Sequence, residues 1–306
     1  MSTPRSLQLP AATHRARWTV RGATLAGLDT PADLGNGHRV SPRATAILVP
    51  GFTGSKEDFL HVLGPLAAHG HRVVTYDQRG QYESPGGTAD PAVFTVAALA
   101  ADLAELVTVL GDGPAHLVGH SFGGLVAAVA TLHRPDLARS LTLLDSGPGR
   151  LPDAARPDLA RFADTLASAG LAAVWAGLRA LDEERGVPPV DDPAVAAFLH
   201  ARFHANSPAC LQAMVAALQG APDRTAELAA CGVPLLVAHG EGEDRWPPPV
   251  QEAMADRLGA PRVVIPAAAH SPAVENPAAT VAALVAFWAQ VERRSASAPD
   301  DRPARR

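Results

Sequence analysis

The sequence is poor in cysteine, in surplus basic charge and in long apolar runs, and each shortage excludes a class of protein. Its two cysteines, Cys210 and Cys231, have no metal-type spacing, so we expect both to be reduced and structural. Twenty-six basic against 31 acidic side chains, without a concentrated basic patch, argue against nucleic acid as a partner. No apolar, uncharged run reaches the roughly 18 residues of a membrane span, and the start lacks a signal-peptide segment. The sequence predicts a cytoplasmic protein without stable membrane insertion, and it predicts no oligomeric state.

The chain is rich in apolar residues. With 306 residues, 47% of them apolar, it can bury a substantial core. Short apolar runs bounded by glycine or proline alternate with longer stretches of helical periodicity, which is the pattern of βαβ units and predicts a parallel sheet covered on both faces. The expected strands are 44–50, 71–77, 115–120, 140–146, 233–240 and 261–267. The expected helices are 56–69, 93–110, 122–133, 250–258 and 276–292.

Three segments depart from this alternation. Residues 17–29 fit an antiparallel hairpin at one edge of the sheet. Residues 147–225 contain few strand signals and much alanine and leucine, so we interpret them as an inserted helical cap. Residues 293–306 are polar, charged and proline-containing, which predicts a disordered tail. The core of the α/β fold is therefore expected to comprise residues 1–146 and 226–292.

A serine lies where one of these strands passes directly into a helix. In "HLVGHSFGGLVAAVA", Ser121 follows the strand and precedes the helix, with Gly119 and Gly123 on either side. Glycine has no Cβ, so strand and helix can approach closely around a residue held in a strained turn. This pattern predicts a nucleophilic hydroxyl exposed above the carboxyl edge of the sheet, although a serine that only caps the helix has the same local sequence.

A nucleophilic serine needs a base, and the base needs a carboxylate. His270 follows the last expected strand, so its loop should lie at the same edge of the sheet as Ser121. The loop after the preceding strand, "EGEDRWPPP", offers Asp244 and Glu243. We favour Asp244 because of the prolines that follow it, while Glu243 competes because it lies three residues after Gly240. Asp145, at the end of the strand after the serine helix, is a third candidate.

Acyl chemistry also requires donors for the oxyanion that develops on the substrate. The backbone N–H of Phe122, the residue after the serine, is the first candidate. The N–H of Phe52, in the glycine-containing loop "PGFTGSKEDF", is the second. The glycines of that loop also fit a simple turn into the helix at 56, and both interpretations can hold together.

Five segments in this order resemble the α/β-hydrolase superfamily: "VPGFTGSKEDF", "VVTYDQRGQYES", "GHSFGG", "VAHGEGEDRWPP" and "AAHSPAVENP". The resemblance covers about residues 40–146 and 226–292. It implies an α/β-hydrolase fold, that is, an eight-stranded, mostly parallel sheet flanked by helices with an inserted helical cap. The triad order serine, acid, histidine matches Ser121, then Asp244 or Glu243, then His270. Gln81 and Tyr82 stand where many relatives carry a small or histidine residue before a serine.

These observations predict a serine hydrolase of the carboxylesterase type. It would cleave an ester or related acyl bond of a small to medium apolar substrate through an acyl-enzyme on Ser121, without cofactor or metal. Phe52, Trp175 and Phe203 are expected to contact the substrate. Three alternatives use the same fold: acyl transfer to another acceptor, hydrolysis of a carbon–carbon bond, and a slow-turnover ligand receptor.

Overall fold

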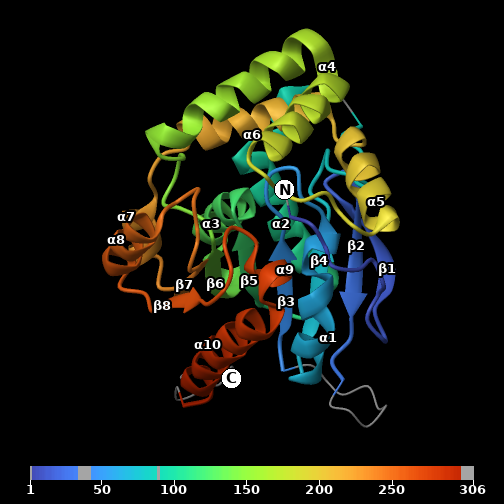
Figure 1. Cartoon of the computed structure of the whole chain (residues 1–306). Helices are drawn as coiled ribbons and strands as arrows, with labels where there is room; N and C mark the ends of the chain where they lie inside the picture. Colours follow the sequence, from blue (N-terminus) through green and yellow to red (C-terminus); the bar gives the residue numbers. More distant parts are fainter. Residues whose placement is uncertain (1, 34–42, 88–89, 298–306) are drawn as a thin grey trace.

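The computed structural model describes residues 2–33, 43–87 and 90–297 and contains one eight-stranded sheet (Figure 1). The strand order in the sheet is β1-β2-β4-β3-β5-β6-β7-β8. The six strands β3 to β8 are parallel to one another. This confirms the predicted α/β fold and the expected strands. The bounds are β1 His14–Val20, β2 Ala23–Thr30, β3 Thr45–Val49, β4 Arg72–Tyr76, β5 Ala115–His120, β6 Ala138–Leu144, β7 Leu235–Gly240 and β8 Arg262–Ile265.

The expected edge hairpin is formed by β1 and β2, which pair antiparallel from His14 with Asp29 to Val20 with Ala23. The two residues that connect them, Arg21 and Gly22, both have positive φ, at 47° and 75°. A two-residue turn with this backbone matches the right-handed twist of the strands. The hairpin extends the sheet beyond β4, to which β2 is antiparallel.

Helices cover both faces of the sheet, because its parallel strands are apolar on both sides. One apolar cluster joins the sheet to α1 (Leu60–Ala68) and α10 (Pro277–Ser297). The other joins it to α2 (Val96–Leu110), α3 (Phe122–His133) and α8 (Pro248–Leu258). The shorter helices α7 (Thr225–Ala230) and α9 (Pro272–Glu275) lie beside these layers (Figure 1).

Of the α-helices between β6 and β7 along the chain, the first three stand above the carboxyl edge of the sheet (Figure 1). We call them the cap: α4 (Arg156–Glu184), α5 (Pro193–His204) and α6 (Pro208–Gly220). Gly170, with φ 77° and ψ −175°, breaks α4 into two arms. A glycine adopts this backbone without steric cost, so the second arm can turn back over the sheet.

The C-terminal tail is partly different from the prediction. Helix α10 continues to Ser297, so residues 293–297, expected to be disordered, are helical. The helix continues past the buried Val291 because each further residue adds a backbone hydrogen bond at little cost once the helix has formed, and the Ser295 hydroxyl donates to the Val291 carbonyl. Residues 298–306 of the expected tail lie outside the described residues. Across the described ranges, none of the helices is both long and apolar enough to cross a membrane.

Candidate active site

Ser121 lies at the turn between β5 and α3, where its backbone has φ 53° and ψ −122°. This conformation is costly for a residue with a side chain, and it persists because the surrounding backbone enforces it. A Cβ on Gly119 would lie 2.4 Å from the Gly124 Cα, and one on Gly123 would lie 2.4 Å from the Val49 carbonyl oxygen. The flanking glycines therefore allow strand and helix to close around Ser121, as the sequence predicted.

A chain of hydrogen bonds runs from the Ser121 hydroxyl into the protein. His270 Nε2 lies 3.0 Å from Ser121 Oγ, and His270 Nδ1 lies 2.7 Å from Glu243 Oε2. The three residues come from the loops after β5, β8 and β7, which all open at the carboxyl edge of the sheet. A hydroxyl bonded to an imidazole whose other nitrogen meets a carboxylate is the arrangement that activates serine as a nucleophile.

The preference for Asp244 over Glu243 is contradicted by this geometry. The Glu243 side chain is fully buried against His270, whereas that of Asp244 is 66% exposed and pairs with Arg245. The two residues are consecutive in a tight loop, so their side chains point in different directions. Glu243 Oε1 also accepts from the backbone N–H groups of Arg245 and Trp246, at 2.7 and 2.8 Å. These bonds hold the Glu243 side chain inward.

The groups around Glu243 keep its carboxyl group ionised. Burial alone would raise its pKa, but the hydrogen bond and charge of His270, together with its other donors, lower the pKa to about 2. His120, whose ring centroid lies 5.2 Å from that of His270, behaves differently. Burial lowers the pKa of His120 to about 4, and its Nε2 donates to the His270 carbonyl at 2.6 Å. His120 is therefore a neutral imidazole that supports the loop of His270.

The loop after β3 is held by two buried glutamine amides. Gln78 Nε2 donates to the Pro50 carbonyl at 2.9 Å, and Gln81 Nε2 donates to the Gly51 carbonyl at 2.8 Å. The Gly51 carbonyl and the Phe52 N–H belong to one trans peptide and point in opposite directions. Gln81 therefore fixes the direction of the Phe52 N–H. Phe122, the first residue of α3, presents its N–H next to Ser121 at the helix N-terminus.

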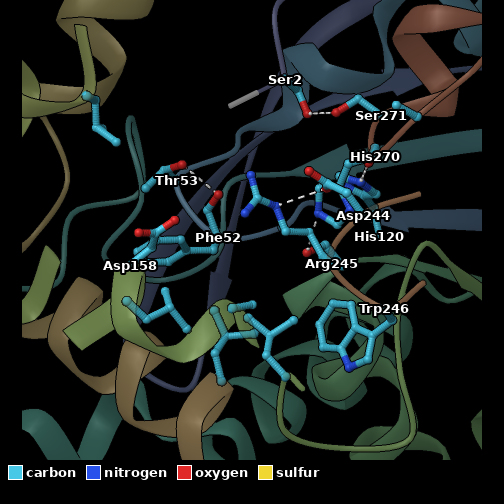
Figure 2. A pocket seen from close by; sticks show the side chains of 18 of the residues that line it. Ser2, Phe52, Thr53, His120, Asp158, Asp244, Arg245, Trp246, His270 and Ser271 are labelled. Carbon is cyan, nitrogen blue, oxygen red and sulfur yellow. Dashed lines mark hydrogen bonds and ion pairs between the residues drawn. The ribbon is translucent and has the colours of Figure 1, made fainter. Parts of the chain in front are cut away.

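A cavity of about 410 Å³ opens above Ser121 and His270 (Figure 2). In Figure 2, Phe52 and Asp158 lie on one side of the cavity and Trp246 on the other. Several apolar lining residues are buried, whereas the charged ones apart from Asp58 are at least partly exposed. The buried apolar lining residues are Leu151, Phe162, Leu218 and Trp246. The partly or fully exposed charged ones are Asp158, Asp182, Arg185, Asp244, Arg245 and Glu275.

Of the three residues expected to contact substrate, only Phe52 lines this cavity. Phe203 is fully buried and packs against Trp175, with ring centroids 5.4 Å apart. Trp175 and Phe203 do not line the cavity, because cap helices bury an apolar face against each other and both rings serve that packing. Phe162 contacts both the cavity wall and the packed cap helices, since its ring lies against Phe52 on one side and Phe203 on the other.

The sequence reasoning missed most of the cavity wall. The lining residues of α4 recur at helical spacing on both sides of Gly170. That spacing is visible in the sequence, but which face of each arm meets the cavity depends on the break. Trp246 was also missed, although it lies in the same loop as Glu243 and Asp244. The lining residues on or beside α4 are Ala155, Asp158, Leu159 and Phe162 in the first arm and Leu178, Leu181, Asp182 and Arg185 in the second.

Two groups of the described residues bring metal-ligating atoms close together. One is Asp145 with Glu243 and His270, of which the last two belong to the hydrogen-bonded chain. The other joins His71 and His116 to Glu292, at 3.0 and 3.5 Å, near the opposite end of β5 from Ser121. Burial lowers the pKa of both imidazoles. Hydrogen bonds from His116 and His71 lower the pKa of the Glu292 carboxyl group to about 2. This second group is a network of neutral imidazoles around a carboxylate.

The chain belongs to the alpha/beta hydrolase family, whose model matches residues 46–284. Hydrolase activity is what this membership supports. The protein RutD of Variovorax paradoxus (strain S110), which carries the name of a carbamate hydrolase, is 30% identical over 266 residues, 83% of this chain and 95% of the relative.

Solved structures agree with the fold. A thermophilic esterase from Thermogutta terrifontis, solved with malate bound, superposes with a TM-score of 0.71 at 25% identity. The match covers 91% of this chain and 99% of that one. A hydrolase from Pseudomonas aeruginosa PA01 gives a TM-score of 0.71 at 27% identity, over 90% and 98% of the two chains.

Proposed function

We propose that this protein is a serine hydrolase that cleaves carboxylic esters of small to medium apolar acids. The observation that carries the proposal is the continuous chain from Ser121 Oγ through His270 to the ionised Glu243, beneath a partly apolar cavity. In this proposal Glu243, and not Asp244, is the acid. It holds the tautomer of His270 that accepts a proton at Nε2 and stabilises the imidazolium.

The reaction proceeds in two halves. Ser121 Oγ attacks the ester carbonyl and gives its proton to His270, which passes it to the departing alcohol. Water then attacks the acyl-enzyme, gives a proton to His270, and the proton returns to Ser121 as the acid leaves. The backbone N–H groups of Phe52 and Phe122 stabilise the oxyanion in both halves. The net change is one ester and one water to one acid and one alcohol.

Turnover on a panel of p-nitrophenyl esters, from acetate to palmitate, tests the proposal. We expect multiple turnovers with acetate and butyrate. A single burst without turnover would instead support the slow-turnover receptor, and product formation only with an added acceptor would support acyl transfer. A p-nitrophenyl carbamate belongs in the same panel, because the similarity to RutD along 95% of that relative makes carbamates a second candidate substrate.

Residues 147–225, which contain the cap, are proposed to form an inserted unit that selects the acyl group. Two contacts fix it to the core. The fully buried Arg202 of α5 donates to Asp58 at 2.7 Å and to the Ser2 carbonyl at 2.8 Å. The Ser207 N–H donates to the Gly80 carbonyl at 2.8 Å. Breaking a buried ion pair of this kind is costly, so the cap should stay closed during turnover.

A closed cap predicts hydrolysis from solution without interfacial activation. Within the described ranges, the large exposed apolar side chains are Val109, Val187 and Val264, which come from three separate segments and form no lipid-binding surface. We therefore expect the rate on a short-chain triglyceride to level off as the solubility limit is crossed. A steep rise only above that limit would show that the cap is a lipase lid. Palmitate esters, which carry the longest acyl chain of the panel, should react slowest in a cavity of about 410 Å³ beneath a closed cap.

The oxyanion donors predict a contrast between two neighbouring glutamines. Gln81→Leu removes the amide that orients the peptide of Phe52, so kcat should fall about 10- to 100-fold with little change in KM. Gln78→Leu is the matched control, because it removes an equally buried amide from the Pro50 carbonyl, one peptide earlier. Melting temperatures of both variants measure the shared loss of packing. An equal fall of kcat in the two variants would contradict the assigned role of the Phe52 N–H.

A further inference from the structure

Asp145 places a second carboxyl group directly behind the hydrogen-bonded chain. It follows β6 and is fully buried. A carboxylate oxygen from Asp145, one from Glu243 and a ring nitrogen of His270 all lie within 4.8 Å of one another. Two ionised carboxylates this close, both removed from water, repel each other with little solvent screening. The arrangement therefore needs a proton between them.

The two oxygens of Asp145 have different surroundings. Oδ1 accepts the Gly240 N–H at 2.9 Å. Oδ2 is buried and, within the part of the chain that the structure describes, meets no hydrogen-bond donor. A buried oxygen without a donor is costly, but the cost disappears if the oxygen carries a proton and donates it to a neighbouring acceptor. Glu243 offers such an acceptor nearby, since one of its carboxylate oxygens lies within 4.8 Å of an oxygen of Asp145.

The charges around the pair decide which carboxyl group holds the proton. Burial, and then the hydrogen bond and charge of Glu243, raise the pKa of Asp145 well above its usual range. Glu275 of α9, the other charged neighbour that bears on Asp145, is also acidic and raises it further. Glu243 faces His270 and two backbone N–H groups, and its pKa falls to about 2. The proton therefore resides on Asp145.

We infer that Asp145 is a neutral carboxylic acid whose Oδ2 proton is donated to Glu243, and that it is a positioning residue for the reaction. The inference rests on the proposed function, in which Glu243 is the acid of the triad. Glu243 then accepts four hydrogen bonds, from Asp145, His270 and the N–H groups of Arg245 and Trp246. Four is about the number that a carboxylate can accept, so its side chain is fixed on every side.

Asp145→Asn and Asp145→Ala separate this inference from an ionised Asp145. The asparagine amide can accept from Gly240 with its oxygen and donate to Glu243 with its nitrogen, and asparagine tolerates the φ of 45° at this position. We expect Asp145→Asn to keep kcat within about threefold. Asp145→Ala loses the donor, so kcat should fall about 10- to 100-fold with KM nearly unchanged.

The pH profile gives a second readout. If Asp145 is neutral, Asp145→Asn removes no charge, and the acid limb of kcat/KM keeps its midpoint. If Asp145 is ionised, the same change removes a negative charge beside the histidine base. The imidazolium would then be less stable, and the acid limb would move to lower pH. Such a shift, or a loss of kcat in Asp145→Asn equal to that in Asp145→Ala, would overturn the inference.

Infrared spectroscopy tests the proton without reference to activity. The difference spectrum of wild type minus Asp145→Asn at pH 7 should contain the carbonyl stretch of a protonated carboxylic acid. Taking the difference removes other buried acids, such as Asp77, whose pKa burial raises to about 7. The absence of the band would overturn the inference, even if Asp145→Ala does not fold. The band should persist on a Ser121→Ala background, so failure of the proposed function and failure of this inference are distinguishable.

Discussion

Replacing Ser121 with alanine is expected to lower kcat on p-nitrophenyl butyrate by about 10⁴- to 10⁶-fold, because no other group can form the acyl-enzyme. The fold should be unaffected. The hydroxyl does not cap α3, and its described hydrogen bond is the one to His270. Alanine also carries the same Cβ as serine at the positive φ of this turn. Steady-state rates and thermal unfolding of the purified variant measure the two expectations.

Ser140→Ala is the matched control for this experiment. The Ser140 hydroxyl also lies against an imidazole, 2.7 Å from His116 Nδ1, but near the opposite end of β5 from Ser121. Its loss should lower stability modestly and leave kcat within about threefold. Ser121→Ala activity within tenfold of wild type, with unchanged melting, would remove Ser121 from the mechanism.

Replacing Glu243 with glutamine is expected to lower kcat by about 10³- to 10⁴-fold. A glutamine amide can present N–H to His270 Nδ1, which favours the tautomer with its proton on Nε2, where it cannot accept from Ser121. The pKa of about 2 for Glu243 means that the carboxylate stays ionised across the working pH range. The substitution removes this negative charge beside His270, so the acid limb of kcat/KM should also move to lower pH, and the loss relative to wild type should be smaller at pH 6 than at pH 8.

Asp244→Asn makes the same change of charge one residue later and is the control for Glu243→Gln. The Asp244 side chain is 66% exposed and pairs with Arg245, so we expect at most about a threefold effect, mainly in KM. Equal losses in the two variants would mean that the loop rearranges during turnover. A larger loss in Asp244→Asn would restore Asp244 as the acid.

Much of the fold could be predicted because its signals are local. Each parallel strand is a short apolar run, and the expected run at 115–120 coincides with β5. The turn at Ser121 could be predicted for a similar reason, since only glycine fits at positions 119 and 123, where a Cβ would lie 2.4 Å from backbone atoms. His270 could be placed at the same edge because the carboxyl ends of parallel strands meet there.

Other features depended on contacts between distant segments. The cavity wall required the break at Gly170, which turns the second arm of α4 back over the sheet. The aromatic residues of the cap suggested a substrate pocket, but Trp175 and Phe203 pack against each other and do not line the cavity. Which carboxylate meets His270 depended on the direction of consecutive side chains in one loop, and a sequence pattern does not contain that direction.

The sequence by itself determined the succession of strands and helices along the chain, the turn at Ser121 and the placement of His270 at the same edge of the sheet. These features follow from periodicity and glycine spacing, which act over a few residues. Only the tertiary structure decided that Glu243 turns inward while Asp244 faces solvent, and that Asp145 lies behind Glu243. The reason is physical. Burial and hydrogen bonding of a carboxyl group depend on what β6, β7 and β8 bring together from positions 27 and 95 residues apart, and these contacts set which acid is ionised.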